Sequence, residues 1–135
     1  LIVFGDGPER ARLTRLAGPT VEFTGGVTQP QLAELIRHSR AFLFPGVEDF
    51  GILPVEVQAG GRPVIALAQG GALETVKAGV TGLLYEDDSV DGLLDAVHTF
   101  EPNAFNPMEC RLNALRFSRD RFEKEMAEII RQVSR

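Results

Sequence analysis

Short, mostly apolar segments alternate with helical patterns along most of this chain. The segments that predict strands are 1–4, 21–23, 41–44, 64–67 and 82–85. The helical patterns between and after them cover 9–17, 28–36, 54–59, 70–76 and 90–100. Strands that are apolar at almost every position are covered on both faces and pair mostly in parallel. We therefore expect an α/β fold with a mostly parallel sheet and helices on both faces.

The pattern changes after Phe100. Asn106 and Ser118 are typical helix N-caps, and Pro107 stands where proline is favoured at the first position of a helix. We therefore expect an α/β core over 1–104 and carboxyl-terminal helices over 105–135. The last helix carries a stripe of apolar residues: Phe122, Met126, Ile129, Ile130 and Val133.

The composition is that of a soluble globular domain. Of 135 residues, 44% are apolar and 24% charged. The net charge of -5 argues against nucleic-acid binding, because phosphate backbones select basic surfaces. No apolar run approaches the roughly 20 residues that cross a bilayer, and no signal peptide is visible. Cys110 is the single cysteine, which fits a reducing, cytoplasmic location. Because the chain opens directly on a core strand, we expect it to be part of a longer protein.

The segment from Phe44 to Glu56 is the leading candidate for a binding site. An apolar strand ends here, and a helix begins after a loop that contains Glu48 and Gly51. In open α/β sheets, ligands bind beyond the carboxyl ends of the strands. The free amides of a helix start attract phosphates, and carboxylates accept hydrogen bonds from hydroxyl groups. The segment thus predicts a site for a phosphate joined to a polyol.

A second loop of the same kind follows the next strand. Gly70 and Gly71 open a helix directly after the segment 64–67. Adjacent parallel strands would place this helix start beside the first one. Glu74 has two equal interpretations, which are capping of the early helix and ligand contact.

Other familiar sites find little support. Gly5 and Gly7 begin a dinucleotide-binding fingerprint, but Arg10 occupies the position of its third glycine, so a tight strand-to-helix turn is favoured. No P-loop is present. His38 and His98 lie far apart in sequence, and we expect no metal site.

An ordered set of motifs runs through residues 44–82. Its members are Pro45, Glu48 and Glu56 around Phe50-Gly51, Gly61-Arg62-Pro63-Val64-Ile65, Gly70-Gly71-Ala72-Leu73-Glu74, and Gly79-Val80-Thr81-Gly82. This set resembles the donor-binding half of the retaining GT-B glycosyltransferases of family 4, the group 1 glycosyl transferases. Earlier segments, Phe4 to Pro8 and Phe23 to Gly25, also resemble that family, so the resemblance covers nearly the whole chain.

The resemblance implies a Rossmann-like domain that binds a nucleotide-sugar donor, GDP- or UDP-linked, without a metal. It implies that the intact enzyme transfers a hexose to an acceptor hydroxyl with retention of the anomeric configuration. The sequence from Glu48 to Val76 resembles mannosyltransferases that use GDP-mannose, which indicates mannose as the hexose. Glu48, the implied catalytic residue, would bind hydroxyls of the hexose. The residues that would meet the sugar and diphosphate are Phe50, Gly51, Ile52, Leu53, Gly70 and Gly71. Glu56 would hold the ribose, and Gly26 and Val27 would lie beside the nucleobase.

The chain also departs from the family pattern. Gly46 stands where serine is usual, Asp49 where glycine is common, and Gly60 where cysteine is frequent. The family's basic pair that neutralises the diphosphate would precede Leu1, as would the amino-terminal domain that binds the glycan or lipid-linked acceptor. The last helix would return to that domain. Whether the intact enzyme also associates peripherally with a membrane stays open.

Two other functions stay open. A sugar-nucleotide epimerase of GT-B architecture would need catalytic groups from the missing domain. A non-catalytic α/β binding module would need none of the carboxylates for ligand binding. For this chain alone we expect weak donor binding and no catalysis.

Overall fold

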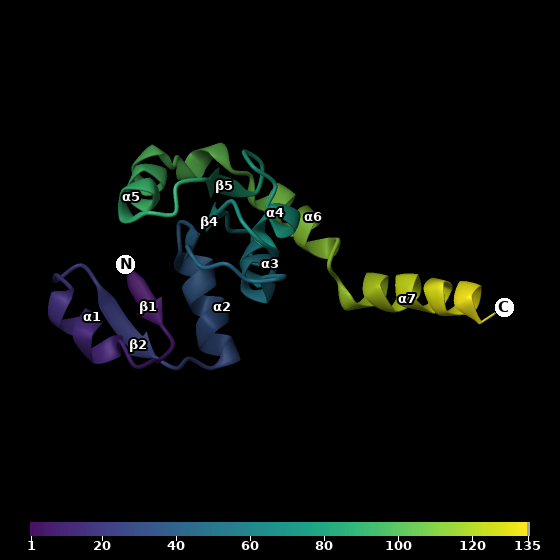
Figure 1. Ribbon diagram of the computed structural model, residues 1–135, viewed down its shortest axis with the longest axis horizontal. Coiled ribbons are helices and arrows are strands. Elements are labelled where there is room, and N and C mark those ends of the chain that lie inside the picture. Colours follow the sequence, from purple (N-terminus) through teal and green to yellow (C-terminus); the bar gives the residue numbers. More distant parts are fainter. Residues whose placement is uncertain (135) are drawn as a thin grey trace. The chain divides into compact units, whose positions relative to one another are not determined.

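The computed structural model describes residues 1–134. The chain divides into two compact units, one formed by Leu1–Leu35 and the other beginning at Ile36. Each unit is described by itself below, with the helix and strand labels of Figure 1.

The first unit is a parallel β-α-β unit. It contains β1 (Ile2–Phe4), α1 (Arg10–Leu16), β2 (Glu22–Gly25) and the beginning of α2 (Gln29–His38). β1 pairs in parallel with β2. The predicted turn after β1 is present, with Gly5 at φ 97° and the Asp6 carboxylate accepting a 2.8 Å hydrogen bond from the Gly7 amide. At the start of α2, the Gln31 side chain accepts a 2.8 Å hydrogen bond from the Thr28 amide, which is one half of a capping box.

The second unit is built on a three-stranded parallel sheet of order β3-β4-β5. Its strands are β3 (Phe42–Phe44), β4 (Val64–Leu67) and β5 (Gly82–Tyr85). Its helices after α2 are α3 (Ile52–Ala59), α4 (Ala72–Thr75), α5 (Val90–Thr99), the 3₁₀ turn η1 (Pro102–Ala104), α6 (Pro107–Leu115) and α7 (Arg119–Val133). The two sheets together contain the five strands expected from the sequence, and every strand pair is parallel, as expected.

Both faces of the central strand β4 are covered. Val64 and Ala66 pack on one face with Val57 of α3 and Val76 after α4. Ile65 and Leu67 point to the opposite face, because side chains alternate along a strand. They are also buried, at 2% and 1% exposure. The expectation that uniformly apolar strands need cover on both faces is therefore confirmed for β4.

The two terminal helices begin at the predicted caps. The Asn106 side chain accepts a hydrogen bond from the Met108 amide at 2.8 Å, and the Ser118 hydroxyl accepts one from the Arg121 amide at 3.4 Å. α6 packs against α3 inside the second unit. α7 presents the predicted apolar stripe to solvent, with Val133 81% exposed. In the described part of the chain, no helix combines the length and apolar character needed to cross a membrane.

Leu67 tests the core. We expect Leu67→Ala to lower the free energy of unfolding by about 2–5 kcal/mol, because it removes a fully buried side chain and leaves a cavity. Leu94→Ala on α5, where the side chain is 47% exposed, is the control and should change stability far less. Urea unfolding of the full-length protein measures both, and equal effects would contradict the assignment of Leu67 to the core.

Candidate functional site

The two predicted loops lie side by side at one edge of the sheet. β3 pairs in parallel with β4, with Phe44 opposite Ala66, so their carboxyl ends meet. β3 leads into the loop of residues 45–51, called here the acidic loop. β4 leads into the turn of residues 68–71, called here the glycine turn.

The acidic loop and the glycine turn are in direct backbone contact. The Gly71 amide donates a 2.7 Å hydrogen bond to the Glu48 carbonyl. A Cβ atom at Gly71 would overlap the carbonyl group of Phe50. Gly70 has a φ of 56°, and a Cβ there would lie 2.5 Å from the Glu48 carbonyl oxygen. Glycine at both positions therefore lets the two loops approach closely. The Gly71 amide is used in the hydrogen bond between the loops.

α3 begins at the end of the acidic loop. Gly51, the residue before it, has a φ of 81°, which glycine adopts without strain. No side chain caps this helix at Gly51. The first amides of a helix lack acceptors within it and carry partial positive charge. The start of α3 therefore suits an anionic group.

The predicted carboxylates are exposed around this helix start. Glu48 lies in the acidic loop and Glu56 in the second turn of α3, and both are exposed. Glu56 follows Ile52 by four residues, so the two share one face of the helix. Ile52 is 67% exposed. The site thus presents acceptors for hydroxyl groups beside an apolar side chain and helix amides.

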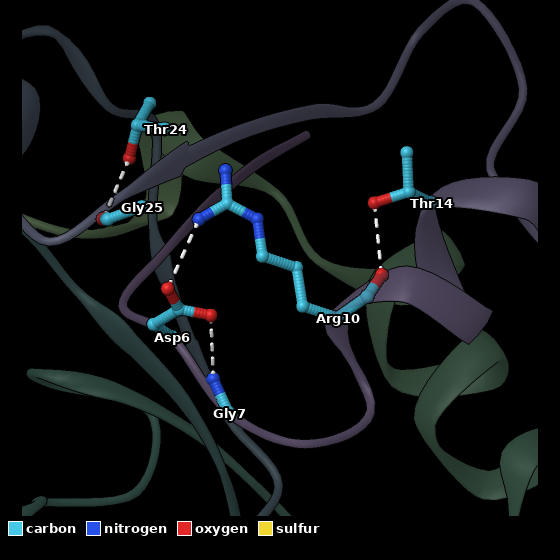
Figure 2. Close-up of polar contacts among 6 residues, drawn as sticks. All are labelled: Asp6, Gly7, Arg10, Thr14, Thr24 and Gly25. Carbon is cyan, nitrogen blue, oxygen red and sulfur yellow. Dashed lines mark hydrogen bonds and ion pairs between the residues drawn. The ribbon is translucent and has the colours of Figure 1, made fainter.

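Gly26 and Val27 belong to the first unit, just after β2 (Figure 2 shows the end of this strand). The Arg10 guanidinium covers Gly25, since a Cβ there would lie 2.8 Å from Arg10 Nη1. The same nitrogen lies 3.4 Å from Asp6 Oδ2. Arg10 thus supplies a cation next to the predicted nucleobase segment. In the sequence it signalled only the failure of a dinucleotide fingerprint.

A buried polar network lies behind the glycine turn. The Thr75 carbonyl, at the end of α4, accepts hydrogen bonds from the Gln58 side-chain amide at 2.9 Å and from the Asn113 side-chain amide at 2.8 Å. Asn113 also donates to Gln58 Oε1 at 2.6 Å. The Thr75 hydroxyl donates to the Gly71 carbonyl at 2.9 Å. This network connects α3, α4 and α6, and no local pattern in the sequence indicates it.

Other chemistry-bearing groups lie away from the candidate site. Cys110 is fully buried in α6, and burial raises the pKa of its thiol, so the reactive thiolate is disfavoured. A hollow of about 310 Å³ between β5 and α5 is lined by residues that include Tyr85 and Asp95. Burial and then the charge of Asp88 raise the pKa of Tyr85. Among residues 1–134, no three His, Cys, Asp or Glu side chains are grouped so as to hold a metal ion.

Comparison with known proteins gives a consistent result. The family model described as glycosyl transferases group 1 matches residues 1–101. The GDP-mannose-dependent alpha-(1-6)-phosphatidylinositol monomannoside mannosyltransferase of Mycobacterium tuberculosis is 38% identical over 110 residues, which cover 72% of this chain and 29% of that protein. The D-inositol 3-phosphate glycosyltransferase of Kribbella flavida is 37% identical over 100 residues, 69% of this chain and 24% of that protein. The chain thus spans less than a third of these relatives' length.

Solved structures are similar over almost all of the chain. Sucrose-phosphate synthase from Thermosynechococcus elongatus superposes with a TM-score of 0.84 at 26% identity, covering 98% of this chain and 38% of that one. Anabaena HepE, solved in complex with UDP-glucose, gives a TM-score of 0.74 at 22% identity over 97% of this chain and 40% of its own. At 22% identity, the similarity to HepE shows the fold alone.

Gly71 tests the contact between the loops. We expect Gly71→Ala to lower the free energy of unfolding by about 1–3 kcal/mol, because the new methyl group overlaps the Phe50 backbone. Gly46→Ala in the acidic loop is the matched control, since a Cβ there has no atom within 4 Å. Thermal unfolding of both variants measures the difference. A Gly71→Ala protein as stable as Gly46→Ala would contradict the close approach.

Asn113 tests the buried network. We expect Asn113→Ala to cost about 1–3 kcal/mol of stability, because Gln58 Oε1 and the Thr75 carbonyl each lose a donor in a buried place. The control, Asn103→Ala, changes an exposed residue of η1 and should stay within about 0.5 kcal/mol of the parent. Urea unfolding midpoints give both values, and an unchanged midpoint for Asn113→Ala would refute the role of the network.

Proposed function

The chain belongs to the group 1 glycosyltransferases and has the GT-B type of α/β fold, and from this premise we propose that it forms the nucleotide-sugar site of a retaining hexosyltransferase. The full-length enzyme would transfer a hexose from a nucleotide diphosphate to an acceptor hydroxyl.

One observation carries the proposal: the backbone contact between the acidic loop and the glycine turn. It holds Glu48, the start of α3 and the glycine turn at one edge of the sheet. The site therefore combines carboxylate acceptors for hydroxyls with helix amides for a phosphate. A nucleotide-sugar carries both kinds of group.

Within this proposal, each residue keeps the role that the family resemblance implies. Glu48, in the loop before the helix start, would bind hexose hydroxyls as the catalytic residue. The helix-start backbone, from Phe50 to Leu53, would face the diphosphate beside Gly70. Glu56, one turn further along α3, would hold the ribose. Gly26 and Val27 of the first unit would lie beside the nucleobase.

In the proposed reaction, the bond between the anomeric carbon of the hexose and the diphosphate oxygen breaks, and the acceptor oxygen bonds to that carbon. The nucleoside diphosphate leaves with the bonding electrons, and its departing oxygen takes the proton that the acceptor hydroxyl loses. Helix-start amides, with cations from outside this chain, would stabilise its charge, so that no metal is needed. Retention means that the product keeps the donor's anomeric configuration, which NMR of the product measures.

The relatives' names support GDP-mannose as the donor. The Mycobacterium tuberculosis protein is named as GDP-mannose-dependent, and it matches 72% of this chain. The acceptor, a glycan or a lipid-linked molecule, would be bound by the rest of the enzyme. The exposed apolar stripe of α7 would pack on that part. Cys110, the single cysteine, is buried and free, which supports a cytoplasmic location. The 135 residues alone would not catalyse the transfer of the sugar.

Glu56 tests the nucleotide site. In the full-length protein, we expect Glu56→Ala to weaken GDP binding roughly 10- to 150-fold, the value of hydrogen bonds to a charged group. Glu101→Ala is the matched control, because Glu101 is also exposed and its side chain caps no helix. Calorimetric titration with GDP, UDP and GDP-mannose measures the binding affinities. The comparison of GDP with UDP identifies the preferred nucleobase.

The outcomes separate the possible functions. Unchanged GDP binding by Glu56→Ala would contradict the proposed nucleotide site and favour a non-catalytic module. Conversion of the donor to another sugar nucleotide without an acceptor would instead favour an epimerase. Acceptor-dependent release of GDP, lost in Glu48→Ala, would agree with transfer.

A further inference from the structure

The ring of Phe50, in the acidic loop, is held by a residue from the other end of the second unit. Phe117, just after α6, lies edge-on to it, with ring centroids 5.5 Å apart and an interplanar angle of 77°. This is a favourable aromatic arrangement. Phe50 is nevertheless 41% exposed. Its ring therefore rests on Phe117 at the surface of the candidate site.

Phe117 is itself fixed by its neighbours. Its amide donates a 3.0 Å hydrogen bond to the Ala114 carbonyl. The Arg116 guanidinium lies 5.2 Å from the centre of the Phe117 ring and donates a 2.8 Å hydrogen bond to Asn113 Oδ1. Asn113 is anchored in the buried network. The position of the ring is thus set by the core of the second unit.

Phe50 is constrained on its other side by its backbone. A Cβ at Gly71 would overlap the Phe50 carbonyl and Cα, so the glycine turn lies directly against this residue. Gly51 follows in the left-handed conformation, and α3 starts at Ile52. A shift of Phe50 would therefore move the backbone between Glu48 and the helix start.

We propose that Phe117 is a positioning residue of the donor site: its ring holds Phe50 so that the backbone from Glu48 to Leu53 keeps the shape that receives the sugar and diphosphate. This inference rests on the proposed function. Phe117 contacts the acidic loop, whereas Glu56 lies further along α3. The contribution of Phe117 therefore concerns the sugar end of the donor more than the nucleoside.

Calorimetric titration of the full-length protein tests this role with two probes, GDP and GDP-mannose. Phe117→Ala weakens GDP-mannose binding roughly 2- to 12-fold, the value of an aromatic pair, and weakens GDP binding less. Phe117→Tyr, which keeps the ring, restores binding of GDP-mannose. In a Phe50→Ala background, Phe117→Ala has no further effect, because the two residues act as one unit.

A matched control separates positioning from stability. Phe105 stacks on Phe100 with centroids 5.2 Å apart, and both rings are half-buried and outside the candidate site. Phe105→Ala thus removes another aromatic pair, a stacked one, and it leaves the ratio of GDP-mannose to GDP affinity unchanged.

The results also distinguish this inference from the proposed function. If the parent protein binds neither probe, the proposed function fails and the inference with it. If the parent binds both and Phe117→Ala keeps the parent's affinity ratio, only the role of Phe117 is overturned. If Phe105→Ala changes the ratio of GDP-mannose to GDP affinity as Phe117→Ala does, the role of Phe117 is also overturned, because lower stability alone would then explain the changed ratio.

Discussion

The shape of the candidate site depends on one backbone contact, where the glycine turn lies against the acidic loop. Parallel pairing of β3 with β4 brings the two loops to the same edge. Only residues without a Cβ allow the final approach, and the Gly71 amide then joins the loops through the Glu48 carbonyl. The exposed carboxylates and the start of α3 are placed by this contact.

The contact is maintained from behind by the buried network. α4 has four residues, too few to be stable alone, so its position must come from packing. The Thr75 carbonyl at its end receives one amide from α3 and another from α6. Gln58, Thr75 and Asn113 are all at most 2% exposed, and buried polar groups of this kind fix one arrangement because any other leaves them unpaired.

The sequence allowed most of the fold to be predicted. Apolar segments predicted most of the strands, and an alternating pattern predicted β2. Asn106 and Ser118 correctly marked two helix starts, because these signals are local. The adjacency of the two helix starts followed from parallel pairing and is confirmed. The roles assigned to Glu48 and Glu56 stay predictions, since they came from a family resemblance and from residue chemistry.

What could not be predicted lies in contacts between distant residues. Gln58 and Asn113 are 55 positions apart, and an isolated polar residue in a helical pattern does not name its partner. The edge-on contact of Phe50 with Phe117 is equally invisible, because Phe117 lies between two helices. The boundary between the compact units falls inside α2, where the helical pattern is continuous.

The distance along the chain between these partners also has a consequence for biosynthesis. The Thr75 carbonyl accepts a hydrogen bond from the side-chain amide of Asn113 in α6, which is synthesised 38 residues later. During translation, the strands and α3 leave the ribosome well before the segment that completes the network. Proteins are made at about 5–20 residues per second, so the interval lasts a few seconds. The nascent chain therefore passes through a stage in which β3, β4 and α3 have been made while the buried network behind the glycine turn is still incomplete.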